Sequence, residues 1–237
     1  MELELTGIVI IVGAYGSGKT EVAINLAVHM NAKGVAVRLA DLDLVNPYFR
    51  SREARQALNR LGIDVVLPPV EYMQADLPIL TPAVSGMLRK PTGLMLLDVG
   101  GDDVGATVLG ALGDALLGKT VHVLQVINPH RPYTGSVSGC LMVRKAIEAK
   151  AKMMITGIVG NANVMEETTE ATILEGYDFS RQVAEAGNIP LVFITAPALL
   201  LTRLDKKDIH CPVLALRRQL VPPWKQPEML DPSVKIA

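Results

Sequence analysis

Eight consecutive residues near the start of the sequence have the composition and spacing of a phosphate-binding loop. Residues 13–20 read Gly-Ala-Tyr-Gly-Ser-Gly-Lys-Thr, which matches the pattern G-x-x-x-x-G-K-[ST]. In such a loop backbone N–H groups turn towards phosphate oxygens, while Lys19 reaches the β- and γ-phosphates and the Thr20 hydroxyl binds Mg²⁺. The predicted phosphate-contacting residues are Gly13, Ala14, Tyr15, Gly16, Ser17, Gly18, Lys19 and Thr20.

Two carboxylates, Asp41 and Asp43, end the next apolar run of the sequence. Side chains alternate along a strand, so both carboxylates are expected on the same side. Ligands of open parallel sheets bind at the carboxyl ends of the strands. One carboxylate can therefore hold a Mg²⁺-bound water while the other orients an attacking water. A pair of solvated or capping carboxylates is the alternative.

A third motif closes the apolar run Leu94–Val99, which contains Asp98 and is followed by Gly100 and Gly101. An aspartate at this place is expected to bind Mg²⁺ through water, as the Walker B aspartate does. Gly101 can present its backbone N–H to a γ-phosphate, and the loop would then move after hydrolysis. A plain turn after the strand is the alternative reading.

In this order the three motifs resemble the MinD/ParA-like branch of P-loop NTPases, the CobQ/CobB/MinD/ParA nucleotide-binding family. The resemblance covers about residues 5–200. It implies ATP and Mg²⁺ as ligands, slow ATP hydrolysis, and a nucleotide switch that acts on a protein partner and commonly dimerises around nucleotide. By motif it assigns Lys19 and Thr20 to phosphate and Mg²⁺, Asp41 and Asp98 to outer-sphere contacts with Mg²⁺, and Asp43 to the attacking water. Lys19 and Asp43 are thus the predicted catalytic residues.

One position departs from this family. Its phosphate loop usually reads K-G-G-x-G-K-[ST], with an extra lysine that reaches the nucleotide of the partner subunit, and Ala14 stands there in this sequence. A homodimer would then rest on apolar helix surface rather than on that lysine. The resemblance supports the branch but no particular subfamily, and the protein partner stays unidentified.

The choice of base favours ATP over GTP. GTPases carry [NT]-K-x-D after a late strand, whereas the nearest string here, residues 205–208, reads Asp-Lys-Lys-Asp and follows no predicted strand. Asn161 follows the predicted strand Met154–Val159, at a place where the resembling family often uses an Asn amide on the adenine edge. An Asn that merely forms a turn is an equal alternative.

Two further segments carry candidate polar residues. The helix predicted over Pro47–Leu61 bears Arg50, Arg52 and Arg55, which would stabilise transferred charge, hold an anionic acceptor, or form a solvated basic face. The loop over residues 128–134 contains two prolines, so it either lines a partner or substrate surface or is a rigid turn into the next helix. His130 in that loop is predicted to be non-catalytic.

Apolar runs alternate with helical stretches along the chain. The predicted strands are Leu5–Val12, Val35–Leu42, Ile63–Leu67, Leu94–Val99, Val121–Ile127, Met154–Val159 and Leu191–Thr195, and the predicted helices are Lys19–Met30, Pro47–Leu61, Val104–Leu117, Thr134–Lys150 and Thr168–Ala186. Right-handed crossovers turn this order into an α/β fold of three layers, a mostly parallel sheet sandwiched between helices. We expect a P-loop domain over residues 1–220 and a Pro-rich C-terminal tail over 221–237 that packs along the surface.

The composition limits the classes of partner. In 237 residues, 23 Lys and Arg face 24 Asp and Glu, which leaves a net charge of -1 and no global field for nucleic acid or an anionic membrane. Cys140 and Cys211 lie too far apart in sequence for a CxxC metal site, and the sequence shows no membrane anchor. A cytoplasmic location is expected. A small-molecule kinase and an assembly or partitioning module with little catalysis are the rival functions.

Overall fold

The computed structural model describes residues 2–43, 54–67, 82–89, 93–101, 103–221 and 224–230. Its strands are β1 (Gly7–Gly13), β2 (Val37–Leu42), β3 (Asp64–Val66), β4 (Leu94–Val99), β5 (Val121–Ile127), β6 (Gly157–Gly160), β7 (Leu191–Pro197) and β8 (Val213–Leu216). Its helices are α1 (Lys19–Ala32), α2 (Arg55–Arg60), α3 (Pro82–Arg89), α4 (Asp103–Ala111), α5 (Gly113–Leu116), α6 (Val137–Ala151) and α7 (Glu170–Gly187), with short 3-10 helices at Met165–Glu167 and Ala198–Leu200.

The strands form one eight-stranded sheet in the order β3-β2-β4-β1-β5-β6-β7-β8, and all of its pairings are parallel. Strand β1 therefore lies between β4 and β5. Because the strands are parallel, their carboxyl ends, and the loops that leave them, gather along one edge of the sheet. The predicted α/β fold with a parallel sheet is confirmed.

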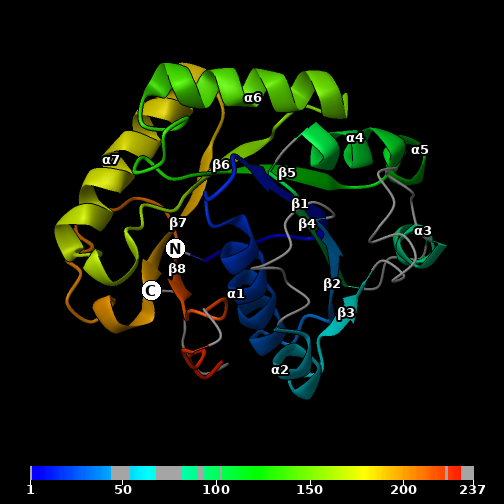
Figure 1. The fold of residues 1–237 in the computed structure, drawn as a ribbon, viewed down its shortest axis with the longest axis horizontal. Helices are drawn as coiled ribbons and strands as arrows, with labels where there is room; N and C mark the ends of the chain where they lie inside the picture. The colour runs from blue at the N-terminus through cyan, green and yellow to red at the C-terminus, as the bar shows by residue number, and fades with distance from the viewer. Residues whose placement is uncertain are drawn as a thin grey trace.

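Helices cover both faces of the sheet, as Figure 1 shows, with α1 and α2 on one face and α4, α5 and α6 on the other. Alternating residues of β1 supply the two cores, since Val9 and Ile11 pack on the α1 side whereas Ile8 and Ile10 pack on the α4 side. Helix α7 packs beside α6 over β6 and β7. Both faces of β1 are thus buried in apolar cores, and this packing fixes the end of the strand from which the phosphate loop begins.

Several predicted elements differ from the observed ones. Strand β8 and helix α3 were not predicted, and α4 and α5, separated at Leu112, stand where one helix was predicted over Val104–Leu117. The predicted strand Met154–Val159 is observed as Gly157–Gly160, because Met154 is exposed and the parallel ladder with β5 begins at Gly157. Short apolar runs of this kind carry too little periodicity to fix their boundaries.

Two predictions fall partly outside the described residues. Of the helix predicted over Pro47–Leu61 the structure describes only α2, and Arg50 and Arg52 lie outside. Of the predicted tail it describes Val221 and residues 224–230, where the N–H of Glu228 donates to the carbonyl of Arg218 at 2.8 Å. The boundary between residues 220 and 221 stays a prediction. Among the described helices, none has the length and apolar character needed to cross a bilayer.

Candidate functional site

The predicted phosphate loop connects β1 directly to α1. Gly18 stands at the N-terminus of α1 with φ of 87°, a left-handed conformation that favours glycine, and no side chain caps this end of the helix. The first N–H groups of α1 are therefore open to a ligand, and the helix dipole favours an anion there. Lys19 and Thr20 begin the helix and are both 6% exposed.

Gly101, in the loop after β4, lies directly against the phosphate loop. A Cβ atom placed on Gly101 would come within 2.8 Å of Lys19 Nζ, 2.9 Å of the Tyr15 nitrogen and 3.0 Å of the Gly13 carbonyl oxygen. A larger residue would therefore displace the lysine or the loop backbone. The structure brings Gly101 and Lys19 together, as the motif order predicts.

The predicted Mg²⁺ residues also converge. Asp41 of β2 is paired in register with Asp98 of β4, and both are fully buried. The Thr20 hydroxyl donates to Asp98 Oδ1 at 3.3 Å, and the N–H of Asp43 donates to Asp41 Oδ1 at 3.1 Å. Hydroxyl and carboxylate oxygens are ligands that Mg²⁺ prefers, directly or through water, so these residues fit the ion.

A site of this kind is not a closed protein cage. Within the described ranges, no three His, Cys, Asp or Glu side chains come close enough to enclose a metal ion. Mg²⁺ commonly keeps several waters and uses one or two carboxylates together with phosphate oxygens. The arrangement of Thr20, Asp41 and Asp98 thus suits an ion that arrives with a nucleotide. Asp43, 3% exposed, lies at the same edge just after β2.

Asn161 joins the phosphate loop to the sheet. Its Nδ2 donates to the carbonyl of Ser17 at 2.7 Å, and its Oδ1 accepts from the Thr195 hydroxyl of β7 at 2.6 Å. The side chain is 3% exposed. The structure therefore uses this amide to position the loop, and a role at a base edge, one of the two sequence interpretations, stays a prediction. Nothing in the sequence pointed to Thr195 as its partner.

A cavity of about 480 Å³ opens beside the phosphate loop, on the β6 to β8 side. Gly16, Gly18 and Asn161 are among its lining residues, and the lining combines apolar side chains with polar and charged ones. The apolar lining includes Pro197, Leu199, Leu200, Leu216 and Leu220. The cavity volume lies in the usual range for small-molecule sites, and apolar side chains beside polar ones suit a ligand that carries both a ring and polar groups.

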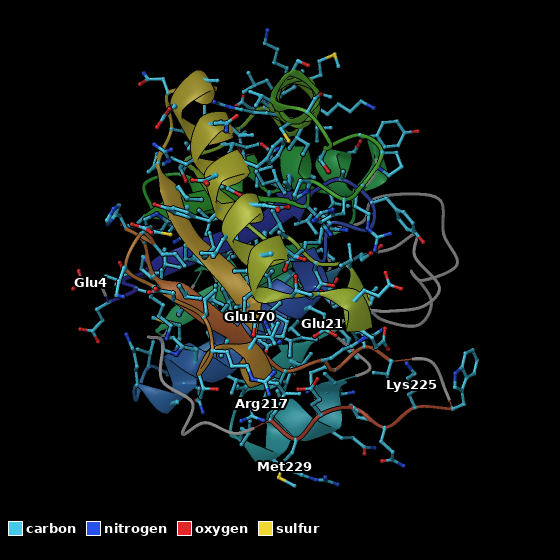
Figure 2. All side chains as sticks on the ribbon, turned by 90° about the vertical axis from the view of Figure 1, so that its left-hand side faces the viewer. Glu4, Glu21, Glu170, Arg217, Lys225 and Met229 are labelled. Atoms are coloured by element: carbon cyan, nitrogen blue, oxygen red, sulfur yellow. The ribbon has the colours of Figure 1, made fainter. Side chains whose placement is uncertain are left out.

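The segment that follows β8 forms one side of this cavity and is held there by α1. Glu21 of α1 accepts from the N–H groups of Gln219 at 2.9 Å and Leu220 at 2.6 Å. One turn later, Asn25 accepts from the N–H of Arg217 at 2.9 Å and donates to its carbonyl at 3.1 Å. Figure 2 labels Glu21 and Arg217, which come from these two segments. Helix α1 thus follows directly from the phosphate loop and also binds the segment that lines the cavity.

Two basic residues of the same segment contact Glu166, which also lines the cavity. Arg218 Nη1 lies 2.9 Å from Glu166 Oε1, and Lys225, labelled in Figure 2, contacts the same oxygen. The hydrogen bond from Lys225 lowers the pKa of Glu166 to about 2. Since this carboxylate is exposed, the contacts fix geometry more than they stabilise the fold.

We expect the Glu21 attachment to depend on pH. Burial raises the pKa of Glu21 from 4.5 to about 7, although the N–H groups of Leu220 and Gln219 act in the opposite direction. A raised pKa in the folded state gives stability that is complete below pH 4.5 and is lost as the pH rises through 7. Relative to Glu21→Gln, the wild-type free energy of unfolding should fall by about 3 kcal/mol between these limits. Urea unfolding of both proteins across this pH range measures it, and parallel pH profiles would contradict it.

Known proteins resemble this chain in fold rather than in sequence. No family model and no curated protein matches the chain. Among solved structures, the chain is similar to the cell division protein FtsY of Thermotoga maritima, with 20% identity, a TM-score of 0.50, and coverage of 80% of this chain and 61% of that one. It is also similar to the chloroplast FtsY of Physcomitrella patens, with 18% identity, a TM-score of 0.55, and coverage of 81% and 59%.

A third similar structure is a nucleotide-binding protein of Archaeoglobus fulgidus in complex with ADP. It is 20% identical, with a TM-score of 0.50, and the alignment covers 82% of this chain and 83% of that one. The chain spans only about 60% of the FtsY structures. At these identities the likeness shows the fold, and the chain has the α/β fold of P-loop NTPases. The finer MinD/ParA-like assignment stays a prediction.

Proposed function

We propose that this protein binds ATP with Mg²⁺, hydrolyses it slowly, and acts as a nucleotide switch of the MinD/ParA-like type for a protein partner. The observation that carries the proposal is the convergence of three separate motifs on one point. Thr20 of the phosphate loop contacts Asp98, and Gly101 abuts both Lys19 and the loop backbone. A glycine-rich turn that occurred by chance would not explain this meeting of β1, β2 and β4.

Each residue then has a chemical role. The loop N–H groups and Lys19 hold the β- and γ-phosphates, and Thr20, with Asp98 and Asp41 beyond it, holds the ion and its waters. Mg²⁺, when bound, neutralises charge that develops between the β- and γ-phosphates. Asp43 accepts a hydrogen bond from the attacking water and orients it for in-line attack. Gly101 donates its N–H to the γ-phosphate, so that loss of this phosphate frees the loop that leads to α4.

One observation supports adenine rather than guanine. The loop after β6 reads Asn161-Ala162-Asn163-Val164, without the lysine and aspartate of [NT]-K-x-D. Three acidic residues, Glu21, Glu166 and Glu228, line the cavity, and Glu21 and Glu166 accept hydrogen bonds from the C-terminal segment. String 205–208 does not line this cavity.

Calorimetry with Mg–ADP, Mg–GDP and non-hydrolysable analogues of ATP and GTP, followed by phosphate release from ATP, tests the proposal. We expect adenine nucleotides to bind at least about tenfold more tightly than guanine nucleotides, and free phosphate to match the ADP formed. ADP formation that requires an added metabolite and releases no phosphate would instead identify a small-molecule kinase. No binding of any nucleotide by the folded protein would contradict the proposal.

A further inference from the structure

The loop between β5 and α6 is held by internal hydrogen bonds and lies at the edge of the sheet that carries the phosphate loop. The N–H of Arg131 donates to the carbonyl of Asn128 at 3.2 Å, and the N–H of Thr134 donates to the carbonyl of Arg131 at 3.1 Å. The Thr134 hydroxyl also donates to the Asn128 carbonyl, at 2.6 Å. Asn128 and Thr134 are 2% and 0% exposed. The backbone of Arg131 is therefore held at both sides by buried groups.

A second set of bonds ties this loop to the neighbouring one. Asn128 Nδ2 donates to the carbonyl of Asn163 at 2.9 Å, and Asn128 Oδ1 accepts from the N–H of His130 at 3.0 Å. These bonds connect the loops after β5 and β6, and Asn128 and Asn163 both line the cavity. The backbone of Arg131 is therefore already held in place, so no backbone ordering has to accompany ligand binding there.

The guanidinium of Arg131 lies on the phosphate loop. A Cβ atom on Gly16 would be 3.3 Å from Arg131 Nε and 3.4 Å from Cζ, so the group packs against the backbone of the loop. Arg131 also lines the cavity, together with Gly16 and Gly18. Its side chain therefore stands at the border between the phosphate-binding backbone and the cavity beside it.

This guanidinium has no counterion in the part of the chain that the structure describes. Its Nε is buried and lacks a hydrogen-bond partner there. By contrast, Arg38 and Arg144 each pair with a carboxylate, at 2.8 Å and 2.9 Å. A guanidinium stays charged at all accessible pH values, so leaving its buried Nε–H without an acceptor is costly. The cost is recovered if an anion binds at this point.

We propose that Arg131 is a nucleotide-contacting residue, whose guanidinium donates hydrogen bonds to phosphate oxygens of the nucleotide held by the phosphate loop of the same subunit. This inference rests on the proposed function, because it requires a phosphate chain at residues 13–20. The planar fork of an arginine suits two oxygens of a phosphate, and its contact adds a second positive charge to that of Lys19. In the sequence, the feature that could have pointed to Arg131 is its place between Pro129 and Pro132, just after a predicted strand.

Calorimetry with Mg–ADP tests the contact through three substitutions at this position. Arg131→Ala and Arg131→Gln should raise the Kd at least about tenfold, since a hydrogen bond to a charged group is lost. Arg131→Lys, which keeps the charge but not the fork, should recover part of the affinity. His130→Ala is the matched control, because His130 is exposed in the same loop and should bind as the wild type does. Thermal unfolding of each variant reports whether the fold is retained.

The outcomes separate this inference from the proposed function. If the wild type and His130→Ala bind Mg–ADP while folded Arg131→Gln binds within twofold of them, the contact is overturned and the function stands. Equal weakening in His130→Ala would show a disturbed loop rather than a lost contact. A loss for adenosine as large as that for Mg–ADP would place the guanidinium on the nucleoside instead. If the wild type binds no nucleotide, the proposed function and this inference both fail.

Discussion

Replacement of Lys19 by alanine is expected to raise the Kd for Mg–ATP at least about 100-fold, since two hydrogen bonds to charged phosphate oxygens are lost. Lys19 is 6% exposed, and its ammonium group lies against Gly101. Its position at the start of α1 directs it to a ligand rather than to the core. The fold should therefore be retained.

Calorimetry with a non-hydrolysable ATP analogue measures this change, with Lys207→Ala as the control. The Lys207 side chain is 85% exposed and lies outside the cavity lining, so its removal should leave the Kd unchanged. Circular dichroism and thermal unfolding of Lys19→Ala confirm that the protein is folded. A Kd within about threefold of wild type in folded Lys19→Ala would show that residues 13–20 are not the phosphate site.

The Asp43→Ala variant is expected to keep its affinity for ATP but to lose turnover by about 100-fold or more, the usual contribution of a positioned base. Orientation of a water stabilises the transition state more than the ground state, so kcat falls while the Kd stays within a few fold. Asp43 follows β2 at 3% exposure, beside the Asp41 carboxylate that its own N–H contacts. Single-turnover phosphate release together with calorimetry separates the two quantities.

Two further variants make the Asp43 result specific. Asp98→Ala removes the carboxylate that contacts Thr20, and it should raise the Mg²⁺ concentration needed for half-maximal binding of ATP. Asp64, on the edge strand β3, pairs with Arg38 of β2, away from the site. Asp64→Ala should therefore leave both the Kd for ATP and kcat unchanged. Equal losses of binding and turnover in Asp43→Ala and Asp98→Ala would mean that the roles of these two residues have been confused.

Much of the site could be predicted because it is encoded over short stretches of chain. The glycines of residues 13–20 and the apolar strand before them determine the phosphate loop locally, and its pattern is specific. Continuous apolar runs mark strands that are buried on both faces, as in β4 and β5, whose bounds were predicted without error. Because strands β2 and β4 are parallel, Asp41 and Asp98 were expected at the same edge of the sheet, and the observed order places them on neighbouring strands in register.

Other parts of the site depend on contacts between segments that are far apart in sequence. Only the tertiary structure decided which of these segments touch. Asn161 binds the carbonyl of Ser17 across 144 positions, and Glu21 binds the N–H of Leu220 across 199. Periodicity and motif spacing report the local environment of the backbone and carry no information on which loops will touch. The contact of the Arg131 guanidinium with Gly16 likewise requires β5 to lie next to β1, and this pairing joins strands that are separated by more than a hundred residues of chain.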